Sequence, residues 1–287
     1  LGWVYELSNQ MSFRSNLGTA FRFPNVAELY SFGLHGSFVE YGLWRFTFNE
    51  EGEPRTDRVL TQEDLDVQLE KGYKWTNDWT YQNGNNRLNV TGYLNFIENY
   101  VFIRPAGATR FINSPNVYFI YDQIDVFFLG LDLTYTHSFS TQWKGTLGMT
   151  LLHDLNGAEA LVNQPSNQVN YILSWKPPQV IKGMINQLKL EGGYTFRQFQ
   201  APLTVSVESI IDGTADISPE SDFFDFMDAP DGYFLLRASW DWEWGHFGGQ
   251  VEVRNILNTR YRDYLNQNRY FADDLGRNFL FNLYYKF

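Results

Sequence analysis

The end of the chain, residues 278–287, alternates strictly between two kinds of side chain. One set of alternate positions is wholly apolar or aromatic: Phe279, Phe281, Leu283, Tyr285 and Phe287. The other set is mixed: Asn278, Leu280, Asn282, Tyr284 and Lys286. A period of two predicts a β-strand whose two faces meet different surroundings. About ten such residues ending on Phe suit a tilted strand that crosses a bilayer, and for this stretch alone an edge strand of a soluble protein is an equally good interpretation.

The same alternation recurs along the whole chain, which predicts an all-β fold. Ten further segments show it, so we expect eleven strands and no helix. These segments are 1–7, 11–22, 64–73, 87–102, 128–137, 143–151, 169–175, 188–197, 235–242 and 250–254. The connections alternate between long and short, and the long ones are expected at 23–62, 103–125, 152–166, 198–231 and 258–275. Long loops at one end and short turns at the other are typical of outer-membrane β-barrels.

The two faces of these strands decide between a membrane barrel and a soluble β protein. The polar face is rich in charge, which by itself would equally suit the solvent face of a soluble sandwich. On the apolar face the aromatic residues favour strand ends, as in the aromatic girdles of membrane barrels. They are Tyr73, Trp143, Trp175, Trp240, Trp242, Tyr285 and Phe287. We therefore predict a transmembrane antiparallel β-barrel in preference to a soluble fold.

Composition excludes several other classes. Aromatic residues make up 18% of the chain, yet no apolar run is long enough for a transmembrane helix. The net charge of -11 argues against a nucleic-acid partner. The four His residues are scattered, so a metal site built from them is not expected, and no pattern typical of an enzyme or of a cofactor site occurs.

The expected strand number indicates an incomplete barrel. Single-chain bacterial barrels have even numbers of strands, whereas an odd number puts the two chain ends on opposite sides of the membrane. The sequence begins without an initiator Met or a signal peptide, and Leu1 already belongs to a strand-like run. We therefore expect a piece of a larger barrel, with roughly half of the strands missing upstream.

The segment after the second expected strand carries a recognisable motif. It reads Phe21-Arg22-Phe23-Pro24-Asn25-Val26-Ala27-Glu28-Leu29-Tyr30, followed by Gly33-Leu34-His35-Gly36. This closely resembles the Phe-Arg-x-Pro-x-x-x-Glu-Leu segment of TonB-dependent outer-membrane receptors, which is often followed by a stretch rich in Gly and His. Residues 88–100 resemble a strand of that family ending near Asn-Tyr, and residues 253–261 resemble its penultimate segment. The resemblance covers essentially the whole chain through the order and spacing of these motifs.

The resemblance implies a plugged barrel of about 22 strands, of which residues 1–287 would be the C-terminal part of a single barrel domain. The plug domain, the TonB-contacting box and the N-terminal strands would be absent from this chain. The implied location is the bacterial outer membrane, as a multi-pass protein. The implied function is active uptake of a scarce nutrient, with ferric siderophore, haem, cobalamin and oligosaccharide all open. Energy would come from the TonB complex, acting through the missing N-terminal part.

The implied partners are outer-membrane lipid, the barrel-assembly machinery, a small nutrient ligand and, optionally, a surface lipoprotein. Two alternatives stay open. One is a passive porin or purely structural barrel, which an upstream plug domain would distinguish. The other is a soluble aromatic-rich β protein that binds glycans, which full solubility without detergent would indicate.

Members of the family hold ligands with loop and upper-lumen side chains. The corresponding candidates here are aromatic and basic residues: Tyr30, His35, Trp44, Arg104, Arg110, Tyr118 and Tyr121. Aromatic surface with a few placed polar groups suits a small ligand, while ordinary loop packing is the better interpretation for any single one of them.

Three further groups carry expectations. Of the motif residues Phe21, Arg22, Pro24, Glu28 and Leu29, the charged pair Arg22 and Glu28 is expected to anchor the start of the long loop. The terminal residues Phe281, Leu283, Tyr285 and Phe287 are expected to close the barrel and to be read during assembly. In the acidic segment 208–231, Asp222, Asp225 and Asp228 could offer carboxylate oxygens to Ca²⁺, although their spacing fits no EF-hand and a solvated acidic loop is the favoured interpretation.

Overall fold

A computed structural model describes residues 1–35, 38–44, 67–111, 114–156, 161–178, 182–217 and 222–287. Eleven strands of this part follow one another through a single antiparallel sheet in the order β1-β2-β5-β6-β7-β8-β9-β10-β13-β14-β15. Their bounds are β1 Gly2–Ser8, β2 Met11–Arg22, β5 Glu70–Asn83, β6 Asn86–Phe111, β7 Ser114–Ser138, β8 Trp143–Asp154, β9 Gln168–Trp175, β10 Met184–Thr195, β13 Tyr233–Trp244, β14 Phe247–Arg254 and β15 Asn278–Tyr285. The prediction of eleven consecutive strands is confirmed.

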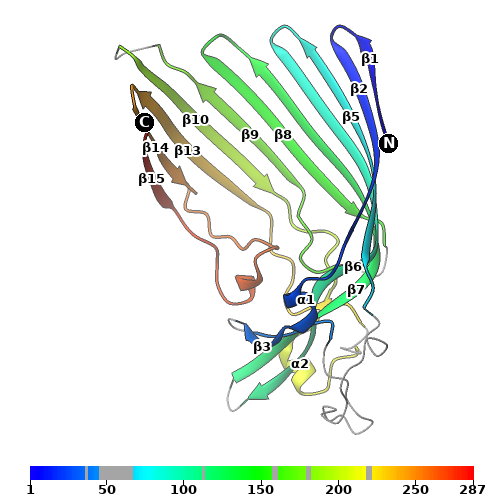
Figure 1. Cartoon of the computed structure of the whole chain (residues 1–287). Coiled ribbons are helices and arrows are strands. Elements are labelled where there is room, and N and C mark those ends of the chain that lie inside the picture. Colours follow the sequence, from blue (N-terminus) through cyan, green and yellow to red (C-terminus); the bar gives the residue numbers. More distant parts are fainter. Residues whose placement is uncertain (36–37, 45–66, 112–113, 157–160, 179–181, 218–221) are drawn as a thin grey trace.

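The sheet is a curved, open wall with β1 at one edge and β15 at the other (Figure 1). Short turns join the strands at the upper end in this view, for example at Gly84, whose φ of 52° is one that glycine adopts without strain. The long connections gather at the lower end. The expected alternation of long and short connections is therefore confirmed, and it places every long connection on one side of the wall.

The long connections hold the remaining elements. After β2 come α1 (Val26–Tyr30), β3 (Phe32–His35) and β4 (Phe38–Tyr41), and after β10 come β11 (Leu203–Thr204), α2 (Val207–Ile211) and β12 (Phe224–Asp225). A 3-10 helix, η2 (Gln267–Tyr270), precedes β15. The expectation of no helix is wrong, because side-chain caps such as Asn25 and Ser206 stabilise these single turns locally. No helix in the described residues is long and apolar enough to cross a membrane.

The segment 103–125, expected to be a loop, is instead a continuation of two strands. Beyond a register shift between Ile97 and Tyr100, β6 and β7 stay paired and project past the wall as a hairpin (Figure 1). We call residues 100–111 and 114–124 the arm. At the shift Asn99 has a φ of 55°, and its backbone N–H donates to Asp125 Oδ1 at 2.9 Å. Such a bulge bends a strand, so the arm leaves the direction of the wall at this residue.

Another expected strand, 64–73, is displaced along the chain. The structure begins β5 at Glu70 and continues it to Asn83, and a two-residue turn joins it to β6. Residues 64–66 lie outside the described part. The strands expected at 188–197 and 250–254 begin earlier than predicted, at Met184 and Phe247.

Buried apolar side chains are concentrated away from the wall. Val126 lies in β7 beside the base of the arm, and the others lie in the arm and the other long connections: Phe38, Val101, Phe102, Ala108, Val117, Phe119, Ile120, Leu161, Val162, Val205, Phe224, Ala229 and Tyr264. We call the described residues of 23–44, the arm, 155–167, 196–232 and 255–277 the loop layer. The apolar face of the wall, by contrast, stays exposed at residues such as Trp79, Leu190 and Phe281. The loop layer therefore has a core of its own, whereas the wall needs an apolar environment outside the chain.

Candidate functional site

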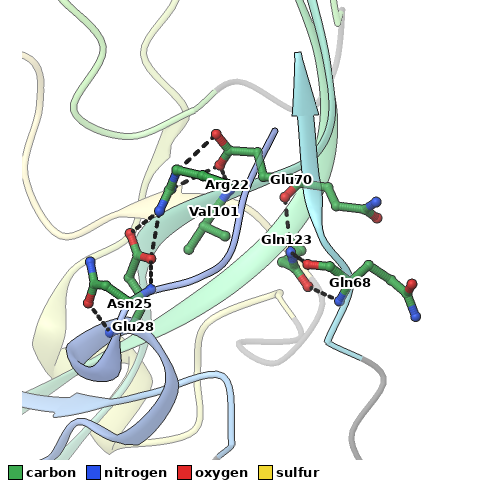
Figure 2. Close-up of polar contacts among 8 residues, drawn as sticks. Arg22, Asn25, Glu28, Gln68, Glu70, Val101 and Gln123 are labelled. Atoms are coloured by element: carbon green, nitrogen blue, oxygen red, sulfur yellow. Dashed lines mark hydrogen bonds and ion pairs between the residues drawn. The ribbon is translucent and has the colours of Figure 1, made fainter. Parts of the chain in front are cut away.

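The loop layer begins at a junction built around Arg22, at the end of β2 (Figure 2). Arg22 Nη1 donates to Glu28 Oε2 at 2.8 Å, and its Nε and Nη2 donate to the Glu70 carboxylate at 3.0 and 2.9 Å. Glu70 Oε2 also accepts the backbone N–H of Val101 at 3.0 Å. One guanidinium thus joins β2, α1 and β5 to the base of the arm. The anchoring role expected for Arg22 and Glu28 agrees with this geometry.

Two local features fix the junction. Pro24 ends β2, because proline cannot donate to a strand ladder. Asn25 then caps α1 in a reciprocal capping box: its side chain accepts the Glu28 backbone N–H, while Glu28 accepts the backbone N–H of Asn25. The glutamate therefore serves the helix cap and the ion pair together. Beside this junction Gln123 exchanges hydrogen bonds with the backbone of Gln68, at 2.8 and 2.9 Å (Figure 2).

The arm carries the apolar core of the loop layer. Phe119 is fully buried against Phe38, Phe226 and Tyr270, with ring centroids 5.1, 5.7 and 5.8 Å away. Burying such a side chain contributes about 1.5–3 kcal/mol, and tilted or edge-on ring pairs add about 0.5–1.5 kcal/mol each. The side of α2 that faces the arm adds Val207, Ile210 and Ile211. Connections far apart in the sequence are thus packed on one hairpin.

A buried ion pair lies next to this core. Arg269 Nη2 donates to Asp225 Oδ2 at 2.7 Å, and the hydroxyl of Tyr270 donates to the other carboxylate oxygen at 2.6 Å. The side chains of Arg269 and Asp225 are 0% and 1% exposed. Burial, and then the charge of Asp225, raises the pKa of the Tyr270 hydroxyl well above its usual range, so this hydroxyl stays a donor. No local signal in the sequence indicates the pair, because its members are 44 residues apart.

Next to the loop layer, the polar face of β9, β10, β13 and β14 is hollowed by a cavity of about 640 Å³. Its lining includes Asn170, Glu191, Arg237, Arg254, Tyr261 and Asn278. Arg237 Nη2 lies 2.5 Å from Glu191 Oε2, and Arg254 Nε lies 2.6 Å from Glu252 Oε1. Tyr261 closes one side and packs on Tyr233 with centroids 4.6 Å apart. The cavity therefore offers paired charges, amides and a phenol, a surface suited to a polar ligand.

The predicted ligand-binding residues fall into separate places in the loop layer. Tyr30 and Trp44 meet edge to face, with centroids 4.4 Å apart, and Tyr118 lies 5.9 Å from the ring of Tyr41. Arg110 is exposed near the tip of the arm. The side chain of His35 lies outside the described part of the chain. Ligand binding by these residues stays a prediction.

Two of the predicted residues, Arg104 and Tyr121, are at least partly buried within the loop layer. Arg104 is 2% exposed, pairs with Asp122 at 2.9 Å and lies over the ring of Phe223 at 5.2 Å. This geometry gives Arg104 a packing role. Burial, followed by the charges of Glu40 and Glu28, raises the pKa of the Tyr121 hydroxyl, which keeps it protonated.

The acidic residues proposed for calcium are not arranged as ligands of one ion. Both carboxylate oxygens of Asp225 are used by Arg269 and Tyr270, and Asp228 accepts from the Thr204 hydroxyl at 2.5 Å. Within the described residues, no group of three or more His, Asp or Glu side chains could hold a metal ion. Calcium binding by Asp222, Asp225 and Asp228 stays a prediction that this geometry does not support.

Comparison with known proteins places the fold. No protein-family profile and no curated protein sequence matches the chain. Among solved structures, the copper transporter OprC matches with a TM-score of 0.67 and 13% identity, over 100% of this chain and 39% of its own. The FrpB iron transporter from Neisseria meningitidis matches with a TM-score of 0.60 and 11% identity, over 100% of this chain and 38% of its own. The siderophore receptor PirA from Acinetobacter baumannii matches with a TM-score of 0.60 and 13% identity, over 99% of this chain and 40% of its own.

These likenesses cover essentially the whole chain but only about two fifths of each matching protein. The identities are low, so the comparison speaks for the fold alone. It confirms the all-β membrane-barrel class. The chain has the fold of part of the barrel of TonB-dependent outer-membrane receptors.

Proposed function

We propose that this chain is part of an outer-membrane receptor that takes up a scarce nutrient by active transport coupled to TonB. The observation that carries the proposal is the combination of a barrel wall with a loop layer that has its own packed core. Solved proteins with this barrel fold are described as transporters of copper or iron and as a siderophore receptor. The wall gives passage through the membrane, and the loop layer gives a structured surface for capture.

Within this proposal, residues 1–287 are the C-terminal part of the barrel, and the plug and the TonB-contacting segment belong to the rest of the protein. The ligand would be small and either metal-bearing or polar: a ferric siderophore, haem, cobalamin or an oligosaccharide. The exposed ring of Tyr30, the half-buried rings of Trp44 and Tyr118, and the charge of Arg110 would form the outer capture surface. The cavity lined by Glu191, Arg237 and Arg254 would offer a second, polar surface on the wall.

Energy-dependent uptake is the direct test. Cells that carry the whole protein would be given each candidate ligand in radiolabelled or metal-labelled form, and accumulation would be measured with and without a protonophore. We expect one ligand to accumulate saturably, and we expect the accumulation to stop in the protonophore and in a strain that lacks TonB.

Uptake that is not saturable and continues without TonB would contradict active transport and would favour a passive porin. A protein that remains fully in the aqueous fraction without detergent would instead contradict the membrane assignment.

A further inference from the structure

Three of the long connections meet at Arg269, and the arm contacts the neighbouring Tyr270. Arg269 belongs to η2 in the connection 255–277, and its guanidinium lies over the rings of Tyr264 and Tyr270, with Cζ 4.6 and 4.2 Å from their centroids. Its Nε donates to the backbone oxygen of Tyr264 at 3.1 Å. The side chain is therefore fixed within its own connection while its far end reaches two others.

The first link joins 255–277 to 196–232. Arg269 pairs with Asp225 of β12, and the Tyr270 hydroxyl donates to the same carboxylate. β12 in turn pairs with β11, and the backbone N–H of Val205 donates to the backbone oxygen of Asp225 at 2.8 Å. Displacing Arg269 would thus leave a buried carboxylate without its cation at the centre of the neighbouring connection.

The second link joins these two connections to 155–167. Arg269 Nη2 also donates to Asn163 Oδ1 at 3.2 Å, and Gln198 Nε2 donates to the backbone oxygen of Pro165 at 3.1 Å. Leu161 of the same connection is buried with Phe102 and Val126 of the arm strands. Polar and apolar contacts therefore hold 155–167 to the rest of the loop layer.

The third link joins all of them to the arm. The ring of Phe119 packs on Tyr270 of one connection and on Phe226 of another. Arg104, on the other strand of the arm, lies over Phe223. Because the arm is a hairpin continuous with β6 and β7, it connects the loop layer to the wall.

The ion pair at the centre of these links is costly to bury. Two charges are removed from water, and Arg269 Nη1 has no hydrogen-bond partner within the described residues. The net contribution of such a pair to stability is small, whereas removing one partner is strongly destabilising. A contact with these properties can act as a switch between a closed and an open arrangement.

We propose that the arm and the described residues of the connections 155–167, 196–232 and 255–277 open and close as one cooperative unit, for which the Asp225–Arg269 pair is the latch. Since Tyr261 of the latched connection lines the cavity on the polar face of the wall, opening of the unit would change access to that cavity. The inference goes beyond the proposed uptake function and holds whatever the ligand is.

Amide hydrogen exchange on the whole protein, folded in nanodiscs, tests this coupling. The variant is Arg269→Met, which keeps an unbranched chain beside the two tyrosine rings but removes the charge. Suitable reporters are the hydrogen-bonded amides of Leu155, Val205 and Phe271 and the amide of Tyr118 in the paired strands of the arm, one from each of the four segments. Because opening of the unit would expose all of them together, we expect exchange to accelerate by a similar factor at all four, roughly a hundredfold or more.

The control is Arg260→Met in the same connection, where an 89% exposed side chain pairs with Asp273. It should leave all four reporters unchanged. Acceleration confined to Phe271 in Arg269→Met would overturn the proposal. So would equal acceleration in β9 and β10, because the pair would then stabilise the barrel as a whole. Asp225→Asn removes the charge of the other member of the pair, in the connection 196–232. It must accelerate exchange at the same four reporter amides.

Discussion

At the scale of single residues, Arg22 shows how one side chain can organise a connection. It holds two carboxylates, of Glu28 and Glu70, which are each 14% exposed, whereas Arg22 itself is 41% exposed. Solvent screens such a pair, so the attraction alone is worth little. The larger effect of losing Arg22 is that two poorly solvated carboxylates remain side by side, and the Val101 amide is left bonded to one of them.

We therefore predict that Arg22→Met lowers the free energy of local opening of residues 26–34 by about 1–2 kcal/mol. Amide exchange at Leu29, whose N–H donates to Asn25 O in α1, measures this directly. Arg14→Met is the matched control, because Arg14 is exposed in the same strand and has no ion pair within the described residues. Equal protection of α1 in both variants would show that the junction does not hold the helix.

At the scale of elements, the bulge at Asn99 decides where the wall ends and the arm begins. Its φ of 55° is accessible to Asn and Gly but costs a β-branched residue about 1–2 kcal/mol. The side-chain amide also donates to the Leu69 backbone oxygen at 3.3 Å, next to the start of β5. The bulge is thus fixed by conformation and by one long-range contact.

The prediction for this element compares two substitutions at the same position. Asn99→Val should destabilise the arm by about 1–2 kcal/mol more than Asn99→Gly, because only glycine keeps the left-handed conformation without strain. Exchange of the Tyr118 amide reports the free energy of arm opening. If the Tyr118 amide exchanges at the same rate in both variants, the positive φ of Asn99 does not determine the bend between the wall and the arm.

The same elements show what the sequence could and could not reveal. The wall strands were predictable, because each has an apolar face and a polar face. The arm was not, because its two faces are both covered by other connections, and Pro105, Gly107 and Pro115 interrupt the pattern. The segment 70–83 was misplaced because Asn77 stands among the apolar positions, where its Oδ1 accepts from the Ser15 hydroxyl of β2 at 2.9 Å.

The site was less predictable than the wall for a related reason. Arg22 and Glu28 belong to a short local motif, so their anchoring role could be inferred. The partner of Arg22 at Glu70, and the pairing of Asp225 with Arg269, depend on contacts 48 and 44 residues apart in the sequence. No local pattern distinguishes Asp225 from its acidic neighbours, and the calcium hypothesis overlooked a cation supplied by another connection.

At the scale of the whole molecule, two parts of the chain are stabilised in different ways. The loop layer buries its own apolar side chains, as the clusters around Phe119 and Val126 show. The wall directs its apolar face outward and pairs charges on the other face, for example Lys189 with Asp241 at 3.0 Å. A wall of this kind is stable only when an apolar phase covers its outer face, which is the central claim of the membrane-barrel account.

These 287 residues contain no cysteine, so labels can be introduced here one at a time once any cysteine elsewhere in the whole protein has been replaced, which allows the most direct test of that claim. Single cysteines along β13, spin-labelled in the whole protein in bilayers, would be exposed to oxygen, which dissolves in lipid, and to a water-soluble nickel chelate. We predict strong relaxation by oxygen and little by the chelate at 236, 238 and 240, and weaker relaxation by oxygen at 237, 239 and 241. Equal access of the chelate to both sets would contradict the account, because the apolar face would then lie in water.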